Sequence, residues 1–129
     1  MRLNHVDQEI RAKSLCSNSS LITAIGNDLG FEYIFSHQIR RQAKPGDVCF
    51  AISASGNSPN LIRAFEVCDK NSVHKIALLG FDGGSLLSMA NISVLIPTRD
   101  GMYGPVEDVH LSICHYLAST LKRDIFGEK

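Results

Sequence analysis

Residues 48–60 read VCFAISASGNSPN, a continuous apolar run that passes directly into a loop of small polar residues. The run Val48–Ser53 has the length and apolar continuity of a strand buried on both faces of a parallel sheet. The loop leads into the segment Pro59–Lys70, where apolar residues such as Leu61 and Phe65 recur at helical spacing. A strand, a short loop and a helix in immediate succession predict an α/β fold.

The same alternation extends outward from this unit in both directions. Three further apolar segments are predicted strands: Ala12–Cys16, Lys75–Gly80 and Ile92–Pro97. Three further segments with helical spacing are predicted helices: Ser20–Ile25, Glu32–Arg41 and Val106–Lys122. The last of these carries an apolar stripe formed by Val109, Ile113, Leu117 and Leu121. Alternating strands and helices predict one parallel sheet with right-handed crossovers, in a single domain over residues 1–129.

Composition excludes several classes of protein. With 44% hydrophobic and 20% charged residues, the 129-residue chain has the profile of a globular domain. The formal net charge is zero, so no nucleic-acid or acidic-membrane partner is expected, and the basic cluster Arg40–Arg41 with Lys44 is too short to change this. No apolar run reaches the ~20 residues that span a bilayer, and Met1–Glu9 has no signal-peptide core, which favours the cytoplasm. The four cysteines form no C-x-x-C pair and are predicted to be buried free thiols.

The loop Ser53–Asn60 is the candidate site for chemistry. In a parallel sheet it lies at the carboxyl end of a strand, where α/β proteins bind ligands. Its three hydroxyls, from Ser53, Ser55 and Ser58, are hydrogen-bond donors, and Gly56 permits close approach of the backbone. The following helix directs its free N–H groups and positive dipole end toward the loop, which favours a phosphate group. A polar turn with a good helix cap, formed by Asn57 or Ser58, is the alternative interpretation.

The run AISASGNSPNLIRA (residues 51–64) resembles the signature of sugar isomerase (SIS) domains, and within them the phosphoheptose isomerases. Other stretches agree in the same order: TAIGNDLG (23–30), LGFDGG (79–84) and EDVHLSICH (107–115). The resemblance implies a three-layer α/β/α fold with a parallel sheet in flavodoxin-like order. It also implies that the family's N-terminal third is missing, including its first strand and the helix that carries a glutamate base and a histidine.

The resemblance assigns roles to particular residues. Ser53, Ser55 and Ser58 would bind the phosphate of a sugar phosphate, with Ala54 contributing through its backbone. Asn18 would lie near the sugar hydroxyls. The remaining catalytic positions are Glu107, where the family usually has glutamine, and His115. In some members of the family these two positions are zinc ligands, so zinc is the metal that the resemblance implies. Glu107 and His115 are eight residues apart, about 12 Å along a helix, which is far for chelation of one ion.

Two functions follow from the resemblance. The first is aldose–ketose isomerisation of sedoheptulose 7-phosphate, which supplies heptose for surface polysaccharides. The second is a phosphosugar-binding or regulatory module without catalysis, which the missing base helix favours. Family members assemble as dimers or tetramers, so a homo-oligomer is expected. A chain without the first strand is also expected to be less stable than a complete domain, or to recruit another chain.

Overall fold

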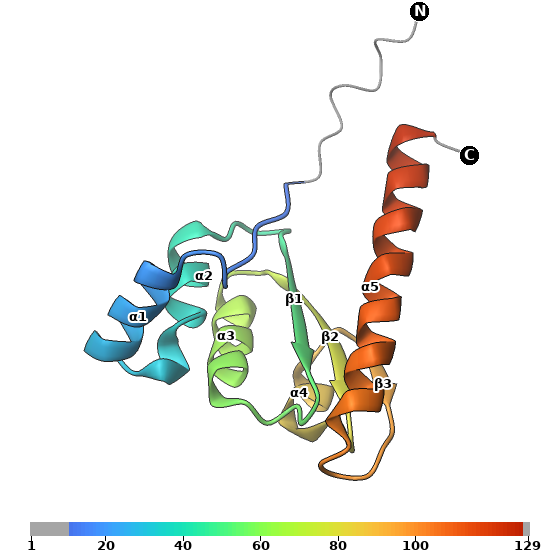
Figure 1. Ribbon diagram of the computed structural model, residues 1–129. Helices are drawn as coiled ribbons and strands as arrows, with labels where there is room; N and C mark the ends of the chain where they lie inside the picture. The colour runs from blue at the N-terminus through green and yellow to red at the C-terminus, as the bar shows by residue number, and fades with distance from the viewer. Residues whose placement is uncertain (1–10, 128–129) are drawn as a thin grey trace, which may run out of the picture.

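A computed structural model describes residues 11–127 of the chain, and Figure 1 shows its arrangement. Nine elements follow one another along these residues. They are α1 (Ser19–Asp28), the 3₁₀ helix η1 (Phe31–Tyr33), α2 (Ser36–Gln42), β1 (Val48–Ser53), α3 (Pro59–Lys70), β2 (His74–Gly80), α4 (Gly84–Met89), β3 (Ile92–Ile96) and α5 (Tyr103–Phe126). No helix within the described range has the length and apolar character needed to cross a membrane.

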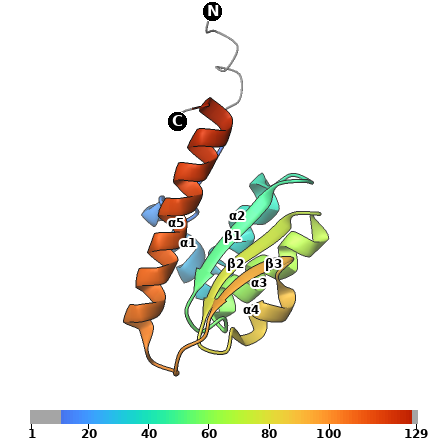
Figure 2. The same cartoon turned by 90° about the vertical axis from the view of Figure 1, so that its right-hand side faces the viewer.

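The three strands form one parallel sheet in the order β1-β2-β3, with Ala51 opposite Ala77 and Leu78 opposite Val94. Helices α3 and α4 lie on one side of the sheet and α5 lies on the other (Figures 1 and 2). The predicted three-layer α/β/α architecture is therefore confirmed. The order is sequential, so strands that follow one another along the chain lie side by side in the sheet.

The predicted strand Ala12–Cys16 was wrong, because this segment is irregular. Ser14 forms hydrogen bonds with residues close to it in the chain. Its carbonyl accepts from Ser17 N at 3.4 Å, and its hydroxyl accepts from Cys16 N at 3.2 Å. Such local bonds offer the backbone an alternative to a strand ladder. Only Leu15 reaches the core, where it packs against the cluster around Ile39.

The predicted helix Glu32–Arg41 is divided into η1 and α2. The side chain of Gln38 is buried at the junction and donates to the carbonyls of Ile34 at 2.8 Å and Leu15 at 3.1 Å. The first bond satisfies the Ile34 carbonyl at the division between η1 and α2, and the second ties the irregular segment before α1 to α2.

The core lies between the sheet and α3. One cluster joins α2 to α3 through Ile39, Val67 and Cys68, and a second joins the sheet to α3 and α4 through Phe65, Leu79 and Leu86. Phe65 and Cys68, which the helical spacing predicted to face inward, are fully buried. The buried face of α3 therefore holds the loop before it in a fixed position against the sheet.

The opposite face of the sheet is covered only in part. In β2 both faces are buried, as the apolar run predicted, but Val48, Phe50 and Ile52 of β1 are exposed. The prediction that β1 is buried on both faces was therefore wrong for the described residues. The reason is that α5, which is the helix on this side, contacts mainly β2.

Candidate functional site

The loop after β1 is held in place by its own side chains. Ser53 is buried, and its hydroxyl oxygen accepts a hydrogen bond from Gly56 N at 3.0 Å. The hydroxyl oxygen of Ser55 accepts from Asn57 N at 3.3 Å. In both bonds the serine oxygen is the acceptor, so each O–H remains able to donate to a ligand.

The segment after β2, including the first turn of α4, forms hydrogen bonds that hold the first loop in place. Asn57 Oδ1 accepts from both the backbone N of Ser85 at 2.9 Å and its hydroxyl at 3.0 Å. In return, Leu86 N donates to the carbonyl of Gly56 at 3.0 Å. Sequence reasoning missed this pairing of Asn57 with Ser85, because 28 residues separate the two side chains and no local pattern connects them.

Two glycines make this close approach of the loops feasible. Gly56 has φ +62°, and a Cβ there would lie 1.9 Å from the carbonyl oxygen of Gly83. Gly84 has φ +52°, and a Cβ there would lie 2.4 Å from the carbonyl oxygen of Ser55. L-residues with a side chain disfavour this backbone region and have no room at either position. Gly83, also in the left-handed region, is the N-cap of α4, and Gly84 is its first residue.

The third serine is differently placed. Ser58 occupies the N-cap position of α3, as predicted, but its side chain makes no capping bond to the helix. The first N–H groups of α3 therefore lack the side-chain acceptor that such a position normally supplies. Pro59 has no N–H, and Leu61 N donates to the Ser58 carbonyl at 3.0 Å. In this first turn the N–H of Asn60 is therefore the group that a phosphate oxygen could accept from, beside the three serine hydroxyls.

Two further oxygens at the same edge of the sheet are without partners. Within the described residues, the buried side-chain polar atoms that lack a hydrogen bond are Asn60 Oδ1 and Thr98 Oγ1. Asn60 lies in the first turn of α3, and Thr98 follows β3, so both belong to segments that adjoin the carboxyl ends of the strands. Buried polar atoms normally have a partner. Sequence reasoning did not single out either residue.

The amino-terminal part of α5 is anchored beside the loop. Val106 is buried and lies against Gly80, whose N–H donates to the carbonyl of Ala54 at 3.0 Å. His110 is also buried, with Nε2 at 3.2 Å from the carbonyl oxygen of Leu79. The ring of Tyr103 packs edge-on against Phe81 with centroids 5.0 Å apart. These contacts hold the start of α5 at the carboxyl end of β2.

The structure does not bring the two catalytic candidates together. Glu107 and His115 are both exposed on one regular helix, so the separation of about 12 Å along its axis remains. Within residues 11–127, no three His, Cys, Asp or Glu side chains are grouped so that they could hold a metal ion. The described residues therefore do not provide a ligand set for zinc, and no chemical step is assigned to a metal.

Asn18 has a structural role. Its side-chain oxygen accepts from Leu21 N at 3.0 Å and so caps α1. This bond lies within α1 rather than at the loop Ser53–Asn60, and the role of Asn18 near a sugar remains a prediction.

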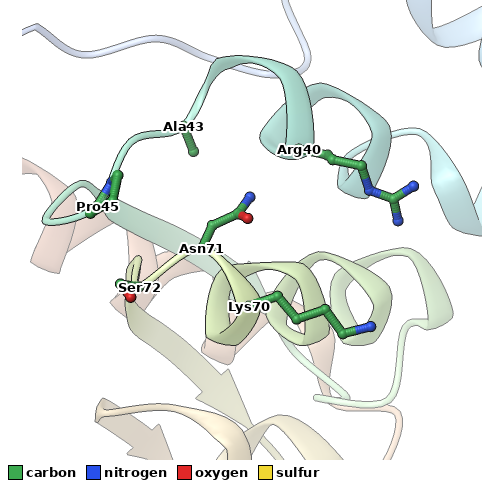
Figure 3. Close-up of a pocket in the computed structure, with 6 residues that line it drawn as sticks. All are labelled: Arg40, Ala43, Pro45, Lys70, Asn71 and Ser72. Atoms are coloured by element: carbon green, nitrogen blue, oxygen red, sulfur yellow. The ribbon is translucent and has the colours of Figure 1, made fainter.

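A hollow of about 250 Å³ lies at the other edge of the sheet, and Figure 3 shows its lining. It is lined by Arg40, Ala43, Pro45, Lys70, Asn71 and Ser72. Arg40 and Lys70 lie in the last turns of α2 and α3, where cations complement the helix dipole. Their side chains extend past the hollow rather than toward each other (Figure 3). Helix-end electrostatics therefore accounts for these basic residues.

The cysteines are free, but only one fits the predicted burial. Cys68 is buried, Cys49 and Cys114 are half-buried, and Cys16 is exposed in the irregular segment before α1. The hydrogen bond with Cys49 and the burial of Cys68 together raise the pKa of the Cys68 thiol. Cys68 is therefore a structural thiol rather than a nucleophile.

Known proteins similar to this chain carry one name. The phosphoheptose isomerase of Trichlorobacter lovleyi is 43% identical over 116 residues, which are 90% of this chain and 58% of that protein. The phosphoheptose isomerase of Geotalea daltonii is 42% identical over 118 residues, or 92% of this chain and 60% of the relative. The solved structure of the phosphoheptose isomerase of Neisseria gonorrhoeae superposes with a TM-score of 0.80 at 34% identity, and covers 85% of this chain and 60% of that one.

No protein-family model matches the chain. The agreement in sequence extends over nearly all of the chain, and the agreement in fold has the same extent. The chain is therefore a homologue of the phosphoheptose isomerases and spans about three-fifths of the length of these relatives.

Proposed function

We propose that this chain binds a sugar phosphate, with the phosphate in the loop Ser53–Ser58 at the start of α3. The observation that carries the proposal is the loop itself, in which the hydroxyls of Ser53, Ser55 and Ser58 and the N–H of Asn60 lie within one short, internally bonded segment at the start of α3. Similarity to phosphoheptose isomerases supports a seven-carbon sugar phosphate, sedoheptulose 7-phosphate, as the ligand. The same proposal treats residues 1–129 as one sugar-phosphate-binding domain of the SIS type, located in the cytoplasm.

Isomerisation is the reaction that we propose for this ligand. A base removes a proton from the carbon next to the ketone, and an enediol forms. Return of a proton to the former carbonyl carbon then gives the aldose. Glu107 and His115 are the candidates for the base and the acid, and Glu107 directly follows Val106, which packs beside the loop. Because these two residues lie apart on α5, we further propose that the chain works as a homo-oligomer.

Binding without catalysis is the second candidate function. It is favoured by the separation of Glu107 from His115 on α5. A phosphosugar-binding or regulatory module would keep the loop and need no base. The two functions differ in their chemistry, so one experiment separates them.

The experiment is proton NMR of sedoheptulose 7-phosphate in D₂O with the purified chain. Isomerisation predicts aldose signals and deuterium at the carbon next to the carbonyl, and Glu107→Gln and His115→Ala should each abolish both. An unchanged sugar with saturable line broadening would establish the binding module instead.

A serine variant tests the loop itself in the same experiment. Ser58→Ala should weaken binding about tenfold or more, because a hydrogen bond to a charged group contributes roughly 1.5–3 kcal/mol. Ser20→Ala, at an exposed serine on α1, is the matched control and should bind as the wild type does. Equal affinity of all three chains would contradict the proposed loop.

A further inference from the structure

Phe81 has a backbone conformation that large residues rarely adopt. Its φ is +52°, and it occupies the first central position of a turn that Gly83 N closes on the carbonyl of Gly80 at 2.8 Å. Turns with a positive φ at this position normally have glycine there. Strained residues persist only where the surrounding structure holds them, and they gather at ligand sites. The side chain of Phe81 is therefore expected to have a task that glycine could not perform.

The ring of Phe81 supports the ring of Tyr103. Phe81 is 7% exposed, and Tyr103 packs edge-on against it at an interplanar angle of 77°, with 5.0 Å between the ring centroids. Tyr103 itself is 50% exposed, so part of its ring is fixed by the contact and part is open to solvent. A tyrosine held in this way presents an apolar ring together with a polar hydroxyl. The pair Phe81–Tyr103 is therefore a supported aromatic surface rather than part of the core.

This aromatic pair adjoins both segments that the proposed function uses. Helix α5, of which Tyr103 is the first residue, begins at the edge of the sheet where β1 and β2 end (Figures 1 and 2). Phe81 directly follows Gly80, whose N–H donates to the carbonyl of Ala54, in the loop after β1, at 3.0 Å. Glu107 follows Tyr103 by four residues, so the two lie on the same side of α5 with about 6 Å between their Cβ atoms. Tyr103 is therefore a neighbour of the candidate base and of the segment that is bonded to the loop.

We propose that Tyr103 is a binding residue for the carbon chain of the sugar phosphate, with its ring against the C–H groups of the chain and its hydroxyl on a sugar hydroxyl. This inference rests on the proposed function, in which the loop after β1 holds the phosphate and Glu107 acts on the reacting carbons. Ligand sites combine apolar and aromatic walls with a few polar groups that fix orientation. The serine hydroxyls of the loop recognise the phosphate, and Tyr103 supplies the selectivity for a sugar phosphate over a free phosphate ion.

Affinities measured separately for two ligands test this. Amide shifts during titration with sedoheptulose 7-phosphate and with inorganic phosphate give the two dissociation constants. Tyr103→Ala should weaken the sugar phosphate about tenfold or more and leave inorganic phosphate within about twofold, because the ring and the hydroxyl contact only the sugar. Tyr103→Phe keeps the ring and should weaken the sugar phosphate about two- to tenfold, as loss of one neutral hydrogen bond does. Phe31→Ala is the matched control, since it removes an aromatic ring that is 64% exposed on η1, and it should change neither constant.

Intrinsic fluorescence provides a second measurement, which reports on the tyrosine itself. The chain has three tyrosines and no tryptophan, so tyrosine accounts for its emission. Sedoheptulose 7-phosphate should produce a saturable change in the wild type, and Tyr103→Phe should abolish most of it. A change of full size in Tyr103→Phe would overturn the proposal.

The two titrations also separate this inference from the proposed function. Tyr103→Ala that weakens both ligands equally would overturn the inference, because a residue that only supports the structure has that effect. Unchanged affinity of Tyr103→Ala for both ligands would overturn it as well, while leaving the loop as the phosphate site. A wild type that binds neither ligand would contradict the proposed function itself.

Discussion

Replacement of Gly56 by alanine is the most direct perturbation of the two-loop arrangement. An alanine Cβ at this position would lie 1.9 Å from the carbonyl oxygen of Gly83, where real contacts stay beyond 3.0 Å. The two loops must therefore separate by about 1 Å. That movement breaks the bond from Leu86 N to the Gly56 carbonyl and strains the two bonds from Ser85 to Asn57.

The expected cost has two parts. The left-handed backbone at φ +62° costs a residue with a side chain roughly 1–2 kcal/mol. Loss of two or three hydrogen bonds adds roughly 1–4 kcal/mol, at 0.5–1.5 kcal/mol for each bond. We therefore expect Gly56→Ala to lower the free energy of unfolding by about 2–6 kcal/mol, a large part of the stability of an ordinary domain.

Urea denaturation followed by circular dichroism measures this difference, with Gly101→Ala as the matched control. Gly101 also has a positive φ, +85°, but nothing lies within 4 Å of a Cβ there. The control should therefore show the backbone cost alone, roughly 1–2 kcal/mol. Equal destabilisation by the two variants would refute the steric argument, because it would mean that the loop after β1 does not press against the loop after β2.

Other parts of the structure give further predictions. His110→Ala should lower the free energy of unfolding by roughly 0.5–1.5 kcal/mol, since it removes the buried hydrogen bond to the Leu79 carbonyl, and chemical denaturation that shows no loss would contradict this anchor. Phe65→Ala should cost about 3–5 kcal/mol by opening a cavity between the sheet and α3, whereas Phe31→Ala, at an exposed site, should cost little in the same melt. At pH 8, iodoacetamide should modify Cys16 first and should modify Cys68 only on unfolding, because burial and the bond with Cys49 raise the pKa of the Cys68 thiol. Mass spectrometry that finds Cys68 alkylated as fast as Cys16 would contradict the packing of α3.

Local sequence patterns correctly predicted the elements whose structure depends mainly on their own residues. The apolar run at Val48–Ser53 and the spacing over Pro59–Lys70 predicted β1 and α3 with their observed bounds. Ala12–Cys16 failed because its short apolar content was outweighed by the local bonds of Ser14. Burial of β1 on both faces failed for a different reason. An apolar run shows that a face needs cover, but not whether the same chain provides it.

The sequence likewise identified some residues of the candidate site and missed others. The three serines and Gly56 could be identified because one loop carries them all. The Asn57–Ser85 bonds and the unpaired oxygens of Asn60 and Thr98 could not, because they depend on how distant segments meet. The roles of Glu107 and His115 rest on resemblance, since on α5 the two residues lie apart.

Amide chemical shifts during titration with sedoheptulose 7-phosphate test the central claim most directly. If the loop after β1 binds the phosphate, saturable shifts should be largest for residues 53–61, and Ser58→Ala should reduce the affinity while Ser20→Ala does not. Saturable shifts confined to residues around Arg40 and Lys70, or no saturable shift at all, would contradict the assignment of this loop as the phosphate site.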